Sequence, residues 1–364
     1  MNGELKPKSA QVRVLIVDDS AFMRTALSRM IGLDRGLRVV GTATNGLEAL
    51  QAIPTLDPDV ITLDVEMPGI NGLETLRRIM VQFPRPVIMV SSVTEKDAEI
   101  TFNALAAGAF DYVPKQLSAT SLDILHIRGD LIAKIKAAAE SRHARGPMDL
   151  PRKPPRAELP RRKTSPVRAA IVAVGVSTGG PKALEEILPQ LPRDLGVPIL
   201  VVQHMPVGFS APFAARLNKL CAVEIREAAQ GEAVRPGVVY LAPAGSHMTV
   251  DRPNNSRTVI CLSEKPDDQL HIPSSDVMMQ SVATAFHSQA MGVIMTGMGA
   301  DGAQGMTAIY REGGFTLGQD ESSCAVYGMP RVCAEMGILS RVVPLARIPS
   351  EILQATHYRK SSVG

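Results

Sequence analysis

Residues 12–20 read VRVLIVDDS and decide the fold of the first part of the chain. Five of the first six positions are aliphatic, and two aspartates follow them directly. An almost continuous aliphatic run of this length is typical of a strand buried on both faces of a parallel sheet. Residues 21–31 then show the apolar spacing of a helix. A buried strand that leads into a helix predicts an α/β fold.

Four further apolar runs follow before residue 115, and helix-like segments separate them. The runs lie at residues 39–43, 60–63, 87–90 and 112–113. The helix-like segments include residues 47–53, 72–81 and 98–107. Five strands that alternate with helices predict a doubly wound parallel sheet with helices on both faces.

The last two hundred residues repeat this alternation. Apolar runs lie at residues 170–174, 199–203, 238–241, 293–296 and 315–317. Helix-like segments include residues 181–188, 212–220 and 302–312. The sequence therefore predicts two doubly wound parallel-sheet α/β domains, of which the second is Rossmann-like.

Residues 141–166 read SRHARGPMDLPRKPPRAELPRRKTSP and differ from both flanking parts. They hold six prolines, and eight Lys/Arg against two Asp/Glu. Proline removes backbone donors and like charges repel, so we expect an extended, flexible linker. The alternative for such a basic run is a tail that binds nucleic acid or an anionic membrane. The expected organisation is a domain at 1–140, a linker at 141–166 and a domain at 167–364.

Composition and charge exclude several classes of function. The chain is 45% hydrophobic and 21% charged, as ordinary globular proteins are, and it has no Trp. Residues 1–140 carry 15 Lys/Arg and 17 Asp/Glu, and residues 167–364 carry 16 and 17, so neither has the basic surface of a nucleic-acid-binding domain. No CxxC pair, signal peptide or membrane-length apolar run is present. We therefore expect a cytoplasmic protein that neither binds nucleic acid nor inserts into a membrane.

Carboxylates end two strands of the first domain. Asp18 and Asp19 follow residues 12–17, and Asp64 follows residues 60–63. Parallel strands end at one edge of the sheet, so the three acids converge there and favour a Mg²⁺ ion. Ser91 and Lys115 follow two more strands and suit the oxygens of a phosphoryl group. Asp64 is then a candidate nucleophile in phosphoryl transfer. The alternative is that these acids are only caps and turn residues.

With these residues in place, residues 12–140 resemble the receiver domain of two-component response regulators, which is flavodoxin-like. The resemblance implies that Asp64 accepts a phosphoryl group from a histidine kinase. It implies that Asp18, Asp19 and Asp64 hold Mg²⁺. It also implies that Ser91 and Lys115 contact the phosphoryl group, and that Tyr112 is the aromatic residue that switches rotamer on activation.

In the second domain, a glycine-rich turn follows the first strand. Residues 175–179 read GVSTG and fit the G-x-S-x-G pattern, which exposes a nucleophilic serine between a strand and a helix. The candidate nucleophile is Ser177. A turn that only joins the two elements, or one that cradles a phosphate, fits the same pattern.

Two further strands of this domain end in residues that complete a hydrolytic set. His204 and His247 each follow a strand or its turn, and the strand of His204 lies nearer that of Ser177 in the sequence. Asp301 lies in a glycine-rich loop after another strand, where the alternative is a helix N-cap. Serine, histidine and aspartate at the ends of three strands of one sheet predict a Ser-His-Asp triad.

Residues 167–350 resemble the catalytic domain of the chemotaxis protein-glutamate methylesterase family. The resembling stretches lie at residues 175–181, 203–209, 240–248, 296–305 and 328–331. The resemblance implies hydrolysis of γ-glutamyl methyl esters on methyl-accepting chemoreceptors, with release of methanol, and deamidation of receptor glutamines. Residues 271–276 depart from the family pattern, which has arginine after the histidine and valine between the serine and the aspartate.

The same resemblance implies a role for each residue of the site. Ser177 is the nucleophile, His204 the general base and then acid, and Asp301 orients His204. The N–H of Met298, with Thr178, stabilises the oxyanion, and no metal is needed for this reaction. The resemblance further implies that the unphosphorylated receiver covers the cleft and that phosphorylation opens it. Two alternatives remain: a receiver attached to a non-enzymatic scaffold, and a receiver with a DNA-binding output.

Overall fold

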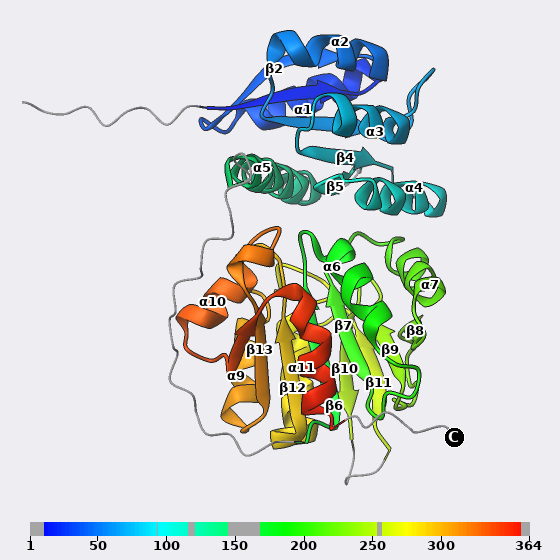
Figure 1. The fold of residues 1–364 in the computed structure, drawn as a ribbon, viewed down its shortest axis with the longest axis vertical. Helices are drawn as coiled ribbons and strands as arrows, with labels where there is room; N and C mark the ends of the chain where they lie inside the picture. The colour runs from blue at the N-terminus through cyan, green and yellow to red at the C-terminus, as the bar shows by residue number, and fades with distance from the viewer. Residues whose placement is uncertain (1–10, 93, 116–120, 145–167, 253–256, 358–364) are drawn as a thin grey trace, which may run out of the picture. The chain divides into compact units, whose positions relative to one another are not determined.

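The computed structural model describes residues 11–92, 94–115, 121–144, 168–252 and 257–357 (Figure 1). The chain divides into two compact units between residues 152 and 153. Each unit contains a parallel sheet flanked by helices, as the alternating pattern predicts. The predicted fold class, two α/β domains, is confirmed.

The sheet of the first unit has five parallel strands in the order β2-β1-β3-β4-β5. This order is that of flavodoxin-like folds, in which ligands bind where the strand order reverses. The reversal lies at β1 and β3, the strands that precede Asp18 and include Asp64. The strands are β1 (Val12–Val17), β2 (Leu37–Ala43), β3 (Val60–Asp64), β4 (Val87–Ser91) and β5 (Asp111–Pro114).

Five helices cover this sheet. Two of them, α1 (Ala21–Gly32) and α5 (Ser121–Ala144), pack together on one face, where apolar side chains of β1 such as Ile16 meet Leu27 and Leu131. The other three helices pack in sequence, α2 against α3 and α3 against α4. These are α2 (Gly46–Leu56), α3 (Gly72–Gln82) and α4 (Glu95–Ala106).

The first unit departs from expectation at its C-terminal end. Helix α5 continues to Ala144, so residues 141–144, which we predicted to begin the linker, are helical. The first proline of the predicted linker is Pro147, and the linker residues before it are compatible with a helix. The rest of the predicted linker, residues 145–166, lies outside the described residues.

The second unit contains a seven-stranded parallel sheet in the order β14-β13-β12-β6-β7-β9-β8. Strand β6 is central and lies between β12 and β7. The chain leaves β6 toward β7 on one side and later returns to β12 on the other, so the topological switch point lies at β6. The strands are β6 (Ile171–Val176), β7 (Ile199–Gln203), β8 (Glu224–Glu227), β9 (Val238–Leu241), β12 (Ala290–Ile294), β13 (Phe315–Gln319) and β14 (Arg341–Val343).

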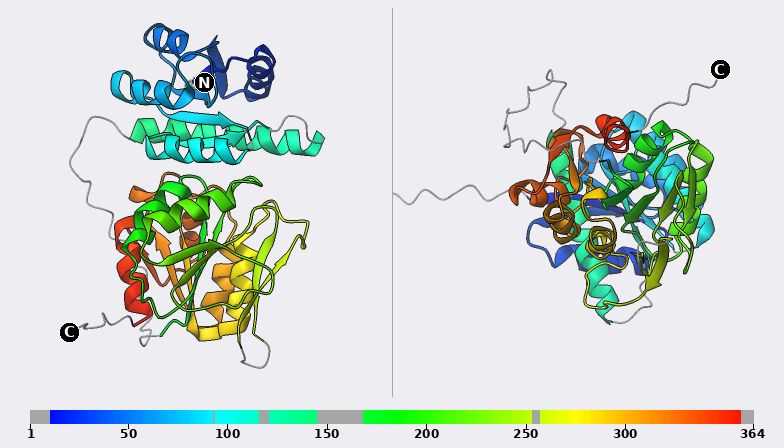
Figure 2. Two further views of the ribbon diagram at one scale, coloured as in Figure 1. Left: turned by 90° about the vertical axis from the view of Figure 1, so that its right-hand side faces the viewer. Right: turned by 90° about the horizontal axis from the view of Figure 1, so that it is seen from below.

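Helices cover both faces of this sheet. Figure 1 shows α6 (Gly180–Ile187) and α11 (Ile348–Ala355) in front of the strands, and Figure 2 shows the unit from the side. Helix α8 (Ser275–Phe286) packs on α9 (Ala303–Arg311) and on β6. The remaining helices are α7 (Ser210–Leu220) and α10 (Met329–Glu335). No helix among the described ranges combines the length and the apolar character needed to cross a membrane.

Several elements of this unit differ from the sequence expectation. The strand predicted at residues 293–296 is β12, which begins at Ala290 and ends at Ile294. Residues 296 and 297 leave the sheet because they hydrogen-bond to the loop at Val326 instead. An antiparallel hairpin, β10 (His247–Asp251) with β11 (Val259–Ser263), lies outside the main sheet and was not predicted, nor were β8 and β14.

Candidate active site

Ser177, His204 and Asp301 follow three neighbouring strands of the second unit. Ser177 directly follows β6, His204 directly follows β7, and Asp301 lies in the loop between β12 and α9. Because β12, β6 and β7 are adjacent and parallel, their C-terminal ends bring the three side chains to one place. This edge of the sheet is where open α/β folds bind ligands.

The turn at Ser177 depends on two glycines and a buried glutamine. Gly179 has φ +76°, a conformation that L side chains rarely adopt. A Cβ on Gly180 would lie 1.9 Å from Oε1 of Gln203, which is buried beneath the turn. Nε2 of Gln203 donates to the carbonyl oxygens of Ser177 and His204, at 3.0 and 2.9 Å. The turn and the end of β7 are therefore held together by one side chain.

The imidazole of His204 bridges the other two residues. Its Nδ1 lies 3.1 Å from Oγ of Ser177, and its Nε2 lies 2.7 Å from Oδ2 of Asp301. An ionised carboxylate only accepts, so Nε2 carries the proton and Nδ1 is free to accept from the serine hydroxyl. Only 7% of the His204 side chain and 11% of that of Asp301 are exposed. The geometry is that of a nucleophile, a base and a residue that orients the base.

Asp301 accepts hydrogen bonds from the first turn of α8 as well as from His204. The donors are Oγ of Ser274 (2.6 Å), N–H of Ser275 (2.6 Å) and N–H of Asp276 (3.1 Å). Burial alone would raise the pKa of Asp301, but the hydrogen bonds from His204, Ser274 and Ser275 outweigh it and lower that pKa well below its ordinary value. Asp301 is therefore ionised at neutral pH. Sequence reasoning did not assign these donors.

Thr178 and Met298, the predicted oxyanion donors, belong to two segments that Thr296 ties together. The Thr296 hydroxyl donates to the carbonyl of Thr178 at 2.9 Å and accepts from the N–H of Val326 at 3.0 Å. The carbonyl of Thr296 accepts from the N–H of Ser177 at 3.0 Å. A Cβ on Gly297 would lie 2.8 Å from Cβ of Ser177. The loop that carries Met298 therefore lies directly against the serine.

Two more histidines lie near this site in different environments. The ring of His271 stacks on that of His204, with 4.1 Å between ring centroids and 23° between the planes. His247, the alternative candidate from the sequence, has no exposed surface and contacts neither Ser177 nor Asp301 through a hydrogen bond. His204 therefore hydrogen-bonds to Ser177 and Asp301 directly, whereas His247 hydrogen-bonds to Pro266 and Ser274.

The predicted acidic site of the first unit also assembles. Nζ of Lys115 lies 3.0 Å from Oδ2 of Asp18 and 2.7 Å from Oδ2 of Asp64. Carboxylate oxygens of Asp18, Asp19 and Asp64 lie within 4.8 Å of one another. Asp18 and Asp64 are buried, while Asp19 is exposed. Three carboxylates at this spacing are an oxygen-only donor set, which fits Mg²⁺.

Burial sets the protonation behaviour of Asp64. Desolvation raises the pKa of Asp64 to about 6, an effect that the adjacent Lys115 partly opposes and that the charge of Asp18 reinforces. The raised pKa of Asp64 indicates that Lys115 alone does not neutralise the buried negative charge. A divalent cation would stabilise the ionised form of Asp64.

Ser91 and Tyr112 lie on the neighbouring strands. Ser91 ends β4 and is fully buried, and its Oγ accepts from Oγ1 of Thr101 on α4 at 2.9 Å. Tyr112, on β5, is buried, and Nζ of Lys134 lies 5.4 Å from its ring centroid. Burial raises the pKa of Tyr112 well above its ordinary value, so its hydroxyl stays protonated. The hydroxyl of Ser91 thus joins the end of β4 to α4, and the backbone carbonyl of Ser91 accepts from the N–H of Lys115 at 2.7 Å.

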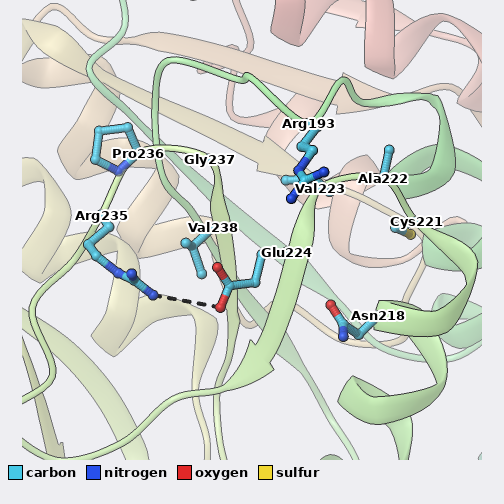
Figure 3. Close-up of a pocket in the computed structure, with 10 residues that line it drawn as sticks. All are labelled: Arg193, Asn218, Cys221, Ala222, Val223, Glu224, Arg235, Pro236, Gly237 and Val238. Carbon is cyan, nitrogen blue, oxygen red and sulfur yellow. Dashed lines mark ion pairs between the residues drawn. The ribbon is translucent and has the colours of Figure 1, made fainter.

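A cavity of about 540 Å³ lies at the opposite edge of the second unit's sheet, at the N-terminal ends of β8 and β9 (Figure 3). Its charged lining residues are Arg193, Glu224 and Arg235, and the last two form an ion pair at 3.6 Å. The three candidate catalytic residues lie at the C-terminal strand ends, so this cavity is separate from them.

Comparison with known proteins identifies the family of this chain. Residues 172–352 match the family model described as CheB methylesterase, and residues 14–125 match that of the response regulator receiver domain. A relative from Nitratidesulfovibrio vulgaris, named protein-glutamate methylesterase/protein-glutamine glutaminase 2, is 43% identical over 95% of this chain and 100% of its own length. The chain belongs to the CheB methylesterase family.

Other similar proteins include a relative from Halalkalibacterium halodurans, named protein-glutamate methylesterase/protein-glutamine glutaminase, which is 42% identical over 95% of this chain and 98% of its own length. The crystal structure of the Thermotoga maritima CheB methylesterase catalytic domain is 36% identical, covers 51% of this chain and 98% of that chain, and has a TM-score of 0.50. The predicted family is confirmed. In this CheB-family chain the receiver domain precedes the methylesterase domain.

Proposed function

We propose that this chain is a phosphorylation-activated hydrolase that removes methyl groups from γ-glutamyl methyl esters of chemoreceptors and deamidates specific receptor glutamines. The observation that carries the proposal is the hydrogen-bonded series Ser177–His204–Asp301 across three adjacent strand ends. The relatives of the same family carry the names of both activities.

In the proposed reaction, Oγ of Ser177 attacks the side-chain carbonyl carbon while Nδ1 of His204 takes its proton. The ionised carboxylate of Asp301 stabilises the imidazolium that forms. The N–H groups of Met298 and Thr178 stabilise the negative oxygen of the tetrahedral intermediate, where one such donor is worth about 3–4 kcal/mol. Methanol leaves with the proton from His204, and ammonia leaves in the deamidation. Water, deprotonated by His204, then hydrolyses the acyl-enzyme and restores Ser177.

The proposed control of this reaction resides in the receiver. Asp64 accepts the phosphoryl group from a chemotaxis histidine kinase, and Mg²⁺ held by Asp18, Asp19 and Asp64 supplies positive charge when bound. Lys115, already 2.7 Å from Asp64, neutralises the charge of the transferred group. The phosphoryl oxygens draw the hydroxyl of Ser91 away from Thr101, and Tyr112 responds by changing rotamer.

The proposed organisation gives each domain one part of this cycle. The receiver comprises residues 1–144 and ends with α5, a linker follows at 145–166, and the hydrolytic domain comprises 167–364. The unphosphorylated receiver restricts access to Ser177, and phosphorylation of Asp64 relieves the restriction. The protein acts in the cytoplasm on the cytoplasmic helices of its receptors.

The experiment measures methanol release from chemoreceptor membranes methylated with labelled methyl groups, with and without a small phosphodonor and Mg²⁺. We expect release that increases with phosphodonor, is abolished by Ser177→Ala, and stays at its basal rate in Asp64→Asn. Release that persists in Ser177→Ala would contradict the proposed nucleophile. Receptor binding without any release in the wild type would favour a scaffold.

A further inference from the structure

His247 is a buried histidine that the proposed reaction does not use. It is the first residue of β10 and has no exposed surface. Its Nε2 lies 2.9 Å from the carbonyl oxygen of Pro266, and its Nδ1 lies 3.1 Å from the backbone nitrogen of Ser274. Both ring nitrogens are therefore engaged by the segment that leads into α8.

These two partners define the protonation of the ring. A carbonyl oxygen only accepts, so Nε2 of His247 carries the proton. A backbone N–H only donates, so Nδ1 presents its lone pair to Ser274. His247 is then neutral, and neither a rotation nor a flip of the ring preserves both hydrogen bonds. The ring fixes the backbone of Ser274 relative to β10.

Ser274, whose backbone His247 holds, contacts Asp301 of the proposed triad. It is the N-cap of α8, and its Oγ lies 2.6 Å from Oδ1 of Asp301. The next two backbone N–H groups, of Ser275 and Asp276, also donate to Asp301. Among the described residues, the carboxylate of Asp301 thus accepts hydrogen bonds from His204 and from three consecutive residues that begin with Ser274.

We propose that His247 is a positioning residue of the hydrolytic reaction: it holds the first turn of α8 so that Asp301 faces His204. The inference rests on the proposed function of Ser177, His204 and Asp301. Because His247 is fully buried it does not contact substrate, and it acts only through Ser274. Its loss therefore affects kcat and leaves KM unchanged.

Two substitutions separate the two hydrogen bonds of the ring. The side-chain oxygen of asparagine occupies the place of Nδ1, so His247→Asn keeps an acceptor for Ser274 and loses the donor to Pro266. Glutamine reaches the place of Nε2, so His247→Gln keeps that donor and loses the acceptor. Each variant gives up one hydrogen bond to backbone, so their folding costs are matched. His287→Gln is the remote control, since this exposed ring pairs with Glu312 on the surface.

We expect kcat for methanol release to fall on the order of 100-fold in His247→Gln, the loss typical of a 1 Å misplacement at a catalytic group. His247→Asn retains kcat close to the wild-type value, and KM is unchanged in both. Equal losses in the two variants, or no loss in either, would overturn the proposal. Equal losses would mean that the ring acts through Pro266 or through packing alone.

A spectroscopic readout tests the inference independently of the proposed function. The proton that Nε2 of His204 shares with Asp301 gives a far-downfield NMR resonance, assigned by its loss in His204→Gln. We expect the resonance to remain in His247→Asn and to shift or disappear in His247→Gln. An unchanged resonance in His247→Gln would overturn the inference even if the wild type released no methanol, an outcome that would by itself contradict only the proposed function.

Substitution of Ser274, which lies between His247 and Asp301, gives a test that does not depend on the folding of the His247 variants. Ser274→Ala removes the hydroxyl that donates to Asp301, while Ser274→Thr keeps one. We expect Ser274→Ala to lower kcat and shift the His204 resonance, and Ser274→Thr to restore both. If Ser274→Ala changes neither, Ser274 does not transmit the constraint and the proposal is wrong.

Discussion

Nζ of Lys115 lies 2.7 Å from Oδ2 of Asp64 at the C-terminal edge of the receiver sheet, where the carboxylate is buried and the lysine is partly exposed. One cation faces the two buried carboxylates of Asp18 and Asp64. Lys115 therefore offsets only part of the cost of burying the second charge. The excess of negative charge at this site favours the binding of a divalent cation, which a phosphoryl-accepting site needs.

The first prediction is that Asp64→Asn stabilises the receiver at neutral and alkaline pH in the absence of Mg²⁺. Burial raises the pKa of Asp64 to about 6, above its ordinary 3.8. The folded state thus binds this proton more tightly than the unfolded chain, and the free energy of unfolding falls as pH rises from about 4 to 6. Above pH 6 the full penalty applies, on the order of 3 kcal/mol, and asparagine removes it.

Chemical denaturation at pH 5 and pH 8, followed for the receiver transition, measures this difference. The stabilisation should be larger at pH 8 than at pH 5, and Mg²⁺ should stabilise the wild type more than Asp64→Asn. A variant that is less stable than the wild type at pH 8 would show that Lys115 overcompensates the buried charge.

The second prediction concerns Asp301→Asn. The amide places an N–H₂ group or a weaker acceptor at His204 and favours the wrong imidazole tautomer, so kcat should fall on the order of 10⁴-fold, as in serine protease triads. The donors of Ser274 and Ser275 also lose a charged acceptor. Single-turnover methanol release measures the loss. The control is Glu335→Gln, an exposed carboxylate on α10, which should leave the rate unchanged.

Several candidate residues of both sites could be predicted because they lie at or just after the end of an apolar run, whereas Asp301 lies further on, in the loop between β12 and α9. Ser177, His204 and Asp64 are placed by the ends of β6, β7 and β3, and in a parallel sheet that is enough to bring them to one edge. The local pattern and the three-dimensional position agree there, so the sequence analysis reached the same residues.

The parts that were missed depend on contacts between distant segments. Ser274 hydrogen-bonds to Asp301 from 27 positions away, and no local pattern marks an N-cap as a partner of a carboxylate in another loop. The shift of β12 to Ala290–Ile294 has a similar cause, since the N–H of Thr296 donates to the side chain of Gln319 and its hydroxyl accepts from the N–H of Val326. Such contacts appear only once the sheet is assembled.

The third prediction is that Thr296→Val lowers kcat about 100-fold, near the lower end of the loss for one oxyanion donor. The substitution keeps the shape of the buried side chain but removes the hydroxyl that joins Thr178 to Val326. The segments that carry Thr178 and Met298 then lose their shared anchor. Thr296→Ser keeps the hydroxyl and should restore most of the rate, with KM similar in both. A loss in Thr296→Ser as large as in Thr296→Val would mean that the methyl group, not the hydrogen bonds, matters.

The last prediction compares two glycines of the second unit. A Cβ on Gly180 would lie 1.9 Å from Oε1 of Gln203 and 2.7 Å from Cγ2 of Val176, so Gly180→Ala must displace the buried glutamine. Gln203 holds the carbonyls of Ser177 and His204, and we therefore expect lower kcat together with about 1–3 kcal/mol of destabilisation from overpacking.

Gly196→Ala is the matched control, because a Cβ there meets nothing within 4 Å and the backbone is not in the left-handed region. It should change neither activity nor stability, or should stabilise slightly by restricting the unfolded chain. Thermal unfolding and methanol release, measured on both variants, distinguish the two effects. If Gly180→Ala unfolds earlier but keeps kcat, Gln203 supports the fold without aligning Ser177 and His204, and the account of the turn given above is wrong.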